Sequence, residues 1–183
     1  MCGMPAPTLV VVSGPPGSGK TTLAHEIARA VGCPAICRDE IKEGMVHANP
    51  GFVPSTSDPL TMRTLTTFFD VLGLLVQAGA TVVAEAAFQD KIWRPRLEPL
   101  TDLADIRIVH CVVDPAVAQD RIARRLEEDA HIRKAHVDRS VMHSGGERPA
   151  FVPVSLPVPQ LHVDTSDGYQ PGIAEIVSFV DKR

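Results

Sequence analysis

The residues best suited to chemistry form one glycine-rich run near the N-terminus. They match the pattern GxxxxGK[ST] and are Gly14, Pro15, Pro16, Gly17, Ser18, Gly19, Lys20 and Thr21. Glycines let backbone N–H groups face phosphate oxygens, and a helix that begins at the run adds the positive end of its dipole. Lys20 would bridge the β- and γ-phosphates, and the hydroxyl of Thr21 would ligate Mg²⁺. This P-loop, with Thr22 behind it, predicts binding of ATP together with Mg²⁺.

The segments on either side of the run have the structure that the motif requires. Residues 8–13 are continuously apolar and β-branched, which is typical of a strand buried on both faces of a parallel sheet. Helical spacing follows up to Gly32. Further strands are expected at 35–37, 81–85, 106–113 and 161–163, with helices between them and a last helix near 173–180. This alternation predicts a single α/β domain over residues 1–183.

Aspartates stand where three helices are expected to begin. Asp39 is predicted to cap a helix that runs to about Val46. Asp58 and Asp114 each precede a proline, the pattern of an N-cap with proline at the first helical position. A helical stretch around 92–100 should be distorted by its two prolines. The last of the three helices leads into a polar stretch, so residues from about 120 to 148 are predicted to form a lid, the alternative being a long solvated loop.

These residues resemble a family of small AAA-type P-loop kinases that includes bacteriophage-type polynucleotide 5′-kinases, zeta-toxin-like sugar-nucleotide kinases and antibiotic phosphotransferases. The resemblance implies a three-layer α/β/α sandwich with five parallel strands in the order 2-3-1-4-5 and a helical lid that carries arginines. In that family an aspartate just after the second strand acts as base on the acceptor hydroxyl. Asp39 resembles it, and Arg38 and Lys42 would then lie near the acceptor.

Two carboxylates fit such a site on physical grounds as well. A parallel sheet presents the carboxyl ends of its strands at one edge, where the P-loop also lies. Asp39 follows the second strand and should therefore face the γ-phosphate, and Glu85 ends the third strand and reaches the same edge. Asp39 could orient a hydroxyl and accept its proton, while Glu85 could hold basic groups beside the acceptor or a water on Mg²⁺. The simpler alternatives are that Asp39 only caps its helix and that Glu85 is an exposed strand-end carboxylate.

Two arginines and one loop complete the predicted site. Arg121 and Arg125 are four residues apart and should project from one helix face, where they could clamp the triphosphate during transfer. The resemblance supports lid arginines at this spacing and suggests that Asp164 and Thr165, after the last strand, hold the adenine ring. The alternatives are a solvated charged face for the arginines and an ordinary turn opened by Asp164.

Composition narrows the choice of partner. A net charge of −4, with only 18 Lys and Arg, disfavours binding to long nucleic acid. The four cysteines form no CxxC pair, and the histidines lack the spacing of zinc motifs, so free thiols in a reducing cytosol are expected. The apolar run near the N-terminus is too short for a signal peptide or a membrane span, which favours a cytoplasmic protein. A monomer or a homodimer is expected.

A kinase is the function that these features favour. The NKxD sequence with which GTPases read their base is absent. The expected reaction is transfer of the γ-phosphoryl group of ATP to a hydroxyl of a small molecule, such as a sugar, nucleoside, sugar nucleotide or antibiotic. One alternative is a polynucleotide 5′-hydroxyl kinase, favoured by Arg38, Asp39 and Lys42 but lacking a basic, aromatic groove. A nucleotide-dependent switch or binding module is an alternative of another class.

Overall fold

The computed structural model describes residues 5–53, 55, 58–128 and 151–182, with the side chains of 126 and 128 left out. Five strands form one parallel sheet in the order β2-β3-β1-β4-β5, which confirms the predicted order. The strands are β1 (Thr8–Ser13), β2 (Ala35–Cys37), β3 (Val82–Glu85), β4 (Asp105–Val112) and β5 (Gln160–Asp164). β1 lies at the centre, and its residues from Leu9 to Ser13 are completely buried, as the continuous apolar run requires.

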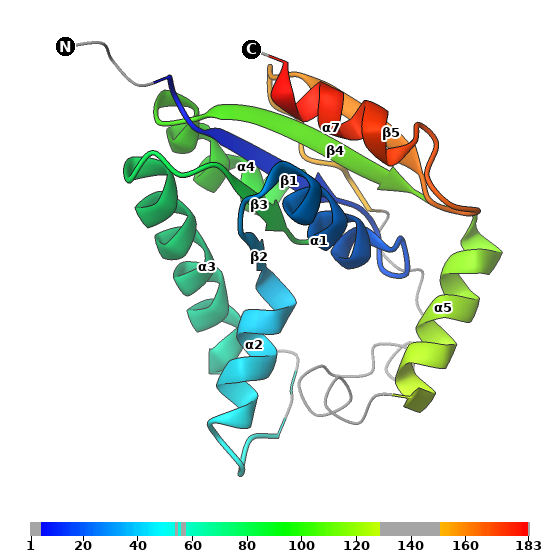
Figure 1. Ribbon diagram of the computed structural model, residues 1–183. Helices are drawn as coiled ribbons and strands as arrows, with labels where there is room; N and C mark the ends of the chain where they lie inside the picture. The colour runs from blue at the N-terminus through cyan, green and yellow to red at the C-terminus, as the bar shows by residue number, and fades with distance from the viewer. Residues whose placement is uncertain (1–4, 54, 56–57, 129–150, 183) are drawn as a thin grey trace.

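Helices cover both faces of the sheet (Figure 1). One face packs against α1 (Lys20–Val31) and α7 (Ile173–Asp181) through a core that contains Val10, Leu23 and Ile176. The other face packs against α3 (Pro59–Gln77) and α4 (Asp90–Leu97), with Phe68 and Leu97 fully buried. These three layers confirm the α/β/α arrangement of a P-loop nucleotide-binding fold.

Two helices extend from the carboxyl edge of the sheet, on either side of the P-loop (Figure 1). α2 (Arg38–His47) follows β2 directly, and α5 (Pro115–Glu128) follows β4. The two strands thus lead straight into the helices that carry the candidate catalytic side chains. The remainder of the predicted lid, from 129 to 148, lies outside the described residues.

The helix starts show where local sequence signals sufficed. Asp58 caps α3, accepting a 2.9 Å hydrogen bond from the backbone N–H of Thr61, and Pro59 is the first helical residue. Asp114 accepts a 2.8 Å bond from Ala116 N at the start of α5. Asp39 is not a cap: α2 begins one residue earlier, at Arg38, so Asp39 lies in the first turn. Capping of α2 therefore does not explain the carboxylate of Asp39.

The prolines around 95–99 divide the expected helix in two. α4 runs through Pro95 but ends at Leu97, and a 3₁₀ helix, η1 (Glu98–Asp102), replaces the predicted last turn. Pro99 has no N–H to donate and disfavours continued α-helix.

α3 is the one helix among the described residues that is long and apolar enough to cross a membrane. Its inner stripe, including Leu65, packs in the core, so it serves here as a core helix.

Candidate active site

The P-loop needs glycine at positions that contact other elements closely. Gly17 has a φ of 78°, and a Cβ there would lie 2.5 Å from the carbonyl oxygen of Ala118 on α5. A Cβ on Gly14 would lie 2.9 Å from the carbonyl oxygen of Cys111 on β4. Side chains at these two positions would push the loop away from α5 and β4. The glycines therefore fix where the phosphate-binding backbone sits.

Lys20 and Thr21, at the start of α1, meet Glu85 at the end of β3. The Thr21 hydroxyl donates a 3.1 Å hydrogen bond to Glu85 Oε2, and Lys20 Nζ lies 3.9 Å from Glu85 Oε1. Glu85 is only 2% exposed, so the carboxylate is an internal part of the site and not a strand-end surface group. Burial raises the pKa of Glu85, and the charge of Lys20 partly offsets that rise. The three residues form one largely buried polar cluster at the carboxyl edge.

This cluster has the donor types that Mg²⁺ prefers. Hard divalent cations take oxygen ligands, often one or two carboxylates with substrate phosphates. The hydroxyl of Thr21 and the buried carboxylate of Glu85 supply such oxygens side by side. The residues present therefore fit a magnesium ion held together with a nucleotide.

Asp39 lies at the same edge as Glu85. Their strands are neighbours, with Cys37 in register with Glu85, so Asp39 stands just beyond the end of the sheet. The two carboxylates are close enough that the charge of Asp39 contributes to raising the pKa of Glu85. Arg38 donates a 2.7 Å hydrogen bond to Asp39 Oδ1, while its buried Nε has no hydrogen-bond partner among the described residues. Asp39 thus lies near Glu85, and Arg38 is paired with Asp39.

Lys42 is placed differently from its predicted role beside the acceptor. It is 5% exposed, and its ammonium group donates 3.0 Å hydrogen bonds to Asp58 Oδ2 and to Thr61 Oγ1. This buried ion pair joins α2 to the start of α3. The sequence could not indicate Asp58 as the partner of Lys42, because the two residues are 16 positions apart and no local motif links them. Lys42 therefore holds α2, the helix that carries Asp39, against α3, and it is not part of the cluster of Lys20, Thr21 and Glu85.

Replacing Lys42 with Met should destabilise the fold by about 3 kcal/mol at neutral pH, because it leaves a buried carboxylate without its cation. Burial raises the pKa of Asp58, but hydrogen bonds from Lys42 and Thr61 outweigh that effect and hold it below its usual value. The pair therefore stabilises the fold above a pH of about 4 and loses that contribution as Asp58 is protonated below it. Urea unfolding from pH 7 to pH 3 should show the difference between variant and wild type shrinking.

Arg94→Met is the matched control for this prediction, because it breaks an exposed pair with Glu98 and should change stability much less. Adding Asp58→Asn to Lys42→Met should recover part of the loss, since the amide oxygen still caps α3 without a charge. Equal unfolding midpoints for Lys42→Met and Arg94→Met would contradict the assignment.

Arg121 and Thr165 fasten α5 and the loop after β5 to the P-loop. Arg121 donates a 2.7 Å hydrogen bond to the carbonyl of Thr165 and a 3.4 Å bond to that of Gly17. The buried hydroxyl of Thr165 donates to the carbonyl of Ser18 at 2.8 Å. Arg125 lies one turn further along α5 and is exposed. The structure thus brings Arg121 to the phosphate loop and leaves Arg125 at the surface.

Asp164 forms the turn that was its simpler interpretation. Its Oδ1 accepts a 2.8 Å hydrogen bond from Ser166 N, which holds its pKa below the usual value, and its side chain is exposed. Ser166 was missed by sequence reasoning: its hydroxyl accepts a 2.9 Å bond from Asp114 N, tying this loop to the start of α5. No motif marks that contact, because the two residues are far apart in the chain.

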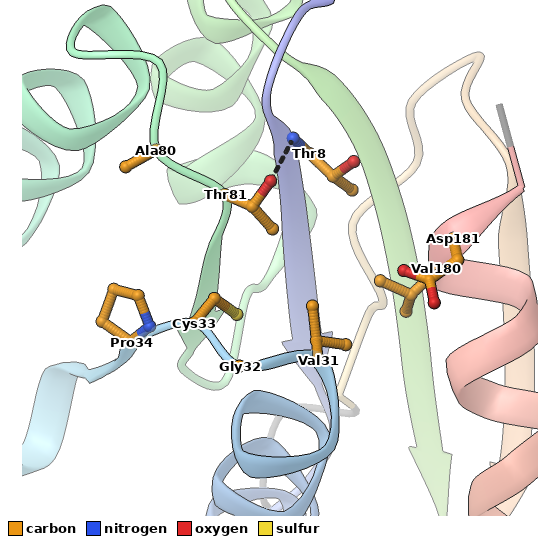
Figure 2. A pocket seen from close by; sticks show the side chains of 9 residues that line it. All are labelled: Thr8, Val31, Gly32, Cys33, Pro34, Ala80, Thr81, Val180 and Asp181. Carbon is orange, nitrogen blue, oxygen red and sulfur yellow. Dashed lines mark hydrogen bonds between the residues drawn. The ribbon is translucent and has the colours of Figure 1, made fainter.

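One hollow of the molecule lies away from this cluster. It has a volume of about 540 Å³ and opens at the amino-terminal edge of the sheet, next to Cys33, Thr81 and Asp181 (Figure 2). Thr81 accepts a 3.1 Å hydrogen bond there from Thr8 N. P-loop chemistry takes place at the opposite, carboxyl edge, so this hollow is not the active site.

Solved structures with the same fold include several kinases. A candidate kinase from Chloroflexus aurantiacus is 25% identical, with a TM-score of 0.80 over 96% of this chain and 97% of its own. The Mycobacterium tuberculosis APS kinase CysC, solved with AMPPNP and APS, is 17% identical with a TM-score of 0.64, covering 98% and 100% of the two chains. A sugar kinase from Janibacter is 18% identical with a TM-score of 0.61, covering 97% and 95%.

The search of curated proteins found no match. Residues 9–144 match the family model described as an AAA domain, a segment that runs from β1 through the P-loop, Asp39, Glu85 and α5. Because this match spans most of the chain and includes the phosphate loop and its surroundings, the protein belongs to the AAA domain family, with the fold of the small P-loop kinases.

Proposed function

We propose that the protein is a kinase that transfers the γ-phosphoryl group of ATP, with Mg²⁺, to a hydroxyl of a small molecule. The observation that carries this proposal is the gathering of Lys20, Thr21, Glu85 and Asp39 at one edge of the sheet. A phosphate-binding lysine, oxygen ligands for a metal and a second carboxylate that can accept a proton are the parts that phosphoryl transfer needs. A protein that only bound the nucleotide would not need a carboxylate facing the γ-phosphate.

Each residue then has a role in one displacement. The P-loop amides and Lys20 would bind the β- and γ-phosphates, and Thr21 and Glu85 would hold Mg²⁺, which would supply neutralisation of the phosphate charge. Asp39 orients the acceptor hydroxyl and takes its proton as the new O–P bond forms, and the bond from Pγ to the β-γ bridging oxygen breaks to release ADP. Arg38, which is hydrogen-bonded to Asp39, would bind the acceptor. Thr165, with Asp164, holds the loop proposed to carry the adenine.

Arg121 should matter more for transfer than the arginine one turn further along α5. Arg121→Ala removes a positive charge next to the P-loop and three hydrogen bonds, to Gly17, Thr165 and Ser166. We expect kcat to fall by at least about 10-fold, because charge that develops on the phosphates loses a nearby cation. Steady-state transfer and thermal unfolding, measured together, separate this effect from loss of fold.

Arg124→Ala is the control on the same helix, since Arg124 is exposed and forms an ion pair with the exposed Asp120. It should leave kcat close to that of the wild type. A similar fall for both variants would show that α5 as a whole, and not Arg121, sets the rate. Arg125→Ala tests whether the exposed arginine takes part once nucleotide is bound.

The proposed acceptor is a small molecule such as a sugar, nucleoside, sugar nucleotide or antibiotic, and two observations support it over a polynucleotide. The polynucleotide alternative relied on three residues, Arg38, Asp39 and Lys42. In the structure Lys42 forms a buried ion pair with Asp58. Of the two basic residues that favoured a polynucleotide, only Arg38 then remains for a phosphate of the strand. The net charge of −4 adds no further attraction for a strand of phosphates.

Transfer of γ-³²P from ATP with Mg²⁺ to pooled acceptors tests the proposal. Separate pools hold sugars, nucleosides and sugar nucleotides, antibiotics, and 5′-hydroxyl oligonucleotides. Label in one of the small-molecule pools supports the proposed class, and label only in oligonucleotides supports the polynucleotide alternative. ATP binding without label in any pool, together with ATP-dependent binding of a partner, would overturn the kinase in favour of a nucleotide-dependent switch.

A further inference from the structure

Three side chains with metal-binding atoms meet beside the active site, and the proposed kinase does not use them. His25 lies on α1, Cys37 ends β2, and Glu40 lies in the first turn of α2. One ligand atom from each lies within 4.8 Å of the other two. The three elements converge here because β2 leads directly into α2 alongside α1. The cluster is therefore built from the rigid framework and not from a loop.

The distance from sulfur to nitrogen within the cluster suits a tetrahedral ion of the zinc type. With Zn–S of about 2.3 Å and Zn–N of about 2.05 Å, tetrahedral coordination separates sulfur from nitrogen by about 3.6 Å. Cys37 Sγ lies 3.6 Å from His25 Nε2. The Glu40 oxygen lies 2.7 Å from the same nitrogen, closer than the about 3.4 Å that a shared zinc would set. The Glu40 side chain is 49% exposed, so solvent leaves room for its carboxylate to move away from His25 and lengthen this distance.

The character of the ligands distinguishes this cluster from the magnesium position. Thiolate and imidazole select zinc, copper or nickel, whereas Mg²⁺ prefers oxygen. Cys37 is 2% exposed, so its sulfur is anchored, while His25 and Glu40 are about half exposed and open to an entering ion. Three protein ligands leave a fourth position for water or another group.

We propose that His25, Cys37 and Glu40 form a binding site for a zinc-type transition-metal ion. The ion takes His25 Nε2, Cys37 Sγ and one Glu40 oxygen, and the thiol proton of Cys37 passes to solvent when the metal–sulfur bond forms. No electron is transferred. Because Cys37 is followed directly by Arg38 and Asp39, a bound ion also fixes the backbone that carries those two residues.

Cobalt(II) titration of the full chain, without an affinity tag and with excess Mg²⁺ but no nucleotide, tests the site. A thiolate bound to Co²⁺ gives a charge-transfer band in the near ultraviolet and strong tetrahedral bands in the visible. Oxygen ligands such as Thr21 and Glu85 give neither. We expect both signals to saturate at one ion per chain and to disappear on addition of Zn²⁺.

Three single variants and one control make the result specific. Cys37→Ser should abolish the charge-transfer band, and His25→Gln and Glu40→Gln should each weaken binding by at least about 10-fold. Cys33→Ser, which changes a half-buried cysteine outside the cluster, should leave the titration unchanged. His25 and Glu40 are partly exposed, so their variants test the site even where Cys37→Ser unfolds.

Two outcomes would overturn the proposal. One is a wild-type chain that gives no thiolate band at millimolar Co²⁺. The other is a band that survives in His25→Gln and Glu40→Gln with unchanged affinity, which would mean that a cysteine alone binds the ion. Neither depends on kinase activity, so the metal site and the proposed function stand or fall separately.

Discussion

Lys20→Ala should lose at least about 100- to 1,000-fold in kcat/KM for ATP, because the P-loop loses the only cation that its motif directs at the β- and γ-phosphates. In the described structure Lys20 also neutralises part of the field around Glu85, at 3.9 Å. Without it, the pKa of the buried Glu85 carboxyl rises further, and a protonated carboxyl is a poor metal ligand. The variant should therefore weaken binding of Mg²⁺·ATP as well as transfer.

Lys91→Ala controls for loss of a lysine as such, since Lys91 is exposed on α4. Binding measured by calorimetry and transfer measured with γ-³²P-ATP should match wild type for Lys91→Ala and fall together for Lys20→Ala. Thermal unfolding without nucleotide tests whether the fold survives. Nucleotide affinity of Lys20→Ala within about threefold of wild type would be incompatible with this role for the lysine.

The P-loop and the sheet could be predicted because their signals are local. The apolar run of β1 is followed directly in sequence by the glycines and Lys20. At Gly14 and Gly17 the structure shows why glycine is needed, because a Cβ would collide with the neighbouring backbone. The order of the strands did not come from such signals. It followed from the family resemblance, and the register between β1, β3 and β4 then confirmed it.

The parts of the site that were misjudged depend on contacts between distant residues. Helical spacing placed Arg121 and Arg125 on one face, but only Arg121 reaches Gly17, because α5 meets the P-loop near its N-terminal half. Lys42 had the right charge for an acceptor site, yet its ammonium group is paired with Asp58 at 3.0 Å. Which partner a long side chain finds depends on how α2 packs on α3, and that is a tertiary property.

The cluster of His25, Cys37 and Glu40 shows the same limit for metal ligands. Zinc motifs are recognised by short spacings such as CxxC, and no spacing of that kind links Cys37 to His25 or Glu40. These three residues are brought together by the crossover from α1 through β2 to α2. Only the packing of helix on strand places the thiol beside the imidazole.

Glu85 and Asp39 divide the work of the two carboxylates through their surroundings. Glu85 is buried and hydrogen-bonded to Thr21, which suits a fixed metal ligand. The Asp39 side chain is 45% exposed and is held by Arg38, so an acceptor can approach it from solvent. Under the proposed function, this difference in exposure favours Asp39 as the base and Glu85 as the metal ligand.

Asp39→Asn should therefore retain ATP binding but lose about 100- to 10,000-fold in kcat for transfer, the range that a positioned general base contributes. The amide keeps the size of the side chain and can still accept a hydrogen bond from Arg38, but it cannot take the proton of the acceptor hydroxyl. Single-turnover transfer to the acceptor found in the pooled assay, alongside nucleotide binding by calorimetry, measures both quantities in one preparation.

Two further variants decide what a loss at Asp39 means. Asp70→Asn makes the same chemical change at an exposed position on α3 and should transfer at the wild-type rate. Arg38→Gln removes the partner of Asp39 and leaves the carboxylate in place. If Asp39 acts as the base, Asp39→Asn is slower than Arg38→Gln, and the double variant is no faster than Asp39→Asn. If Asp39 only positions Arg38, the two single variants are equally slow; normal transfer by Asp39→Asn would refute both roles.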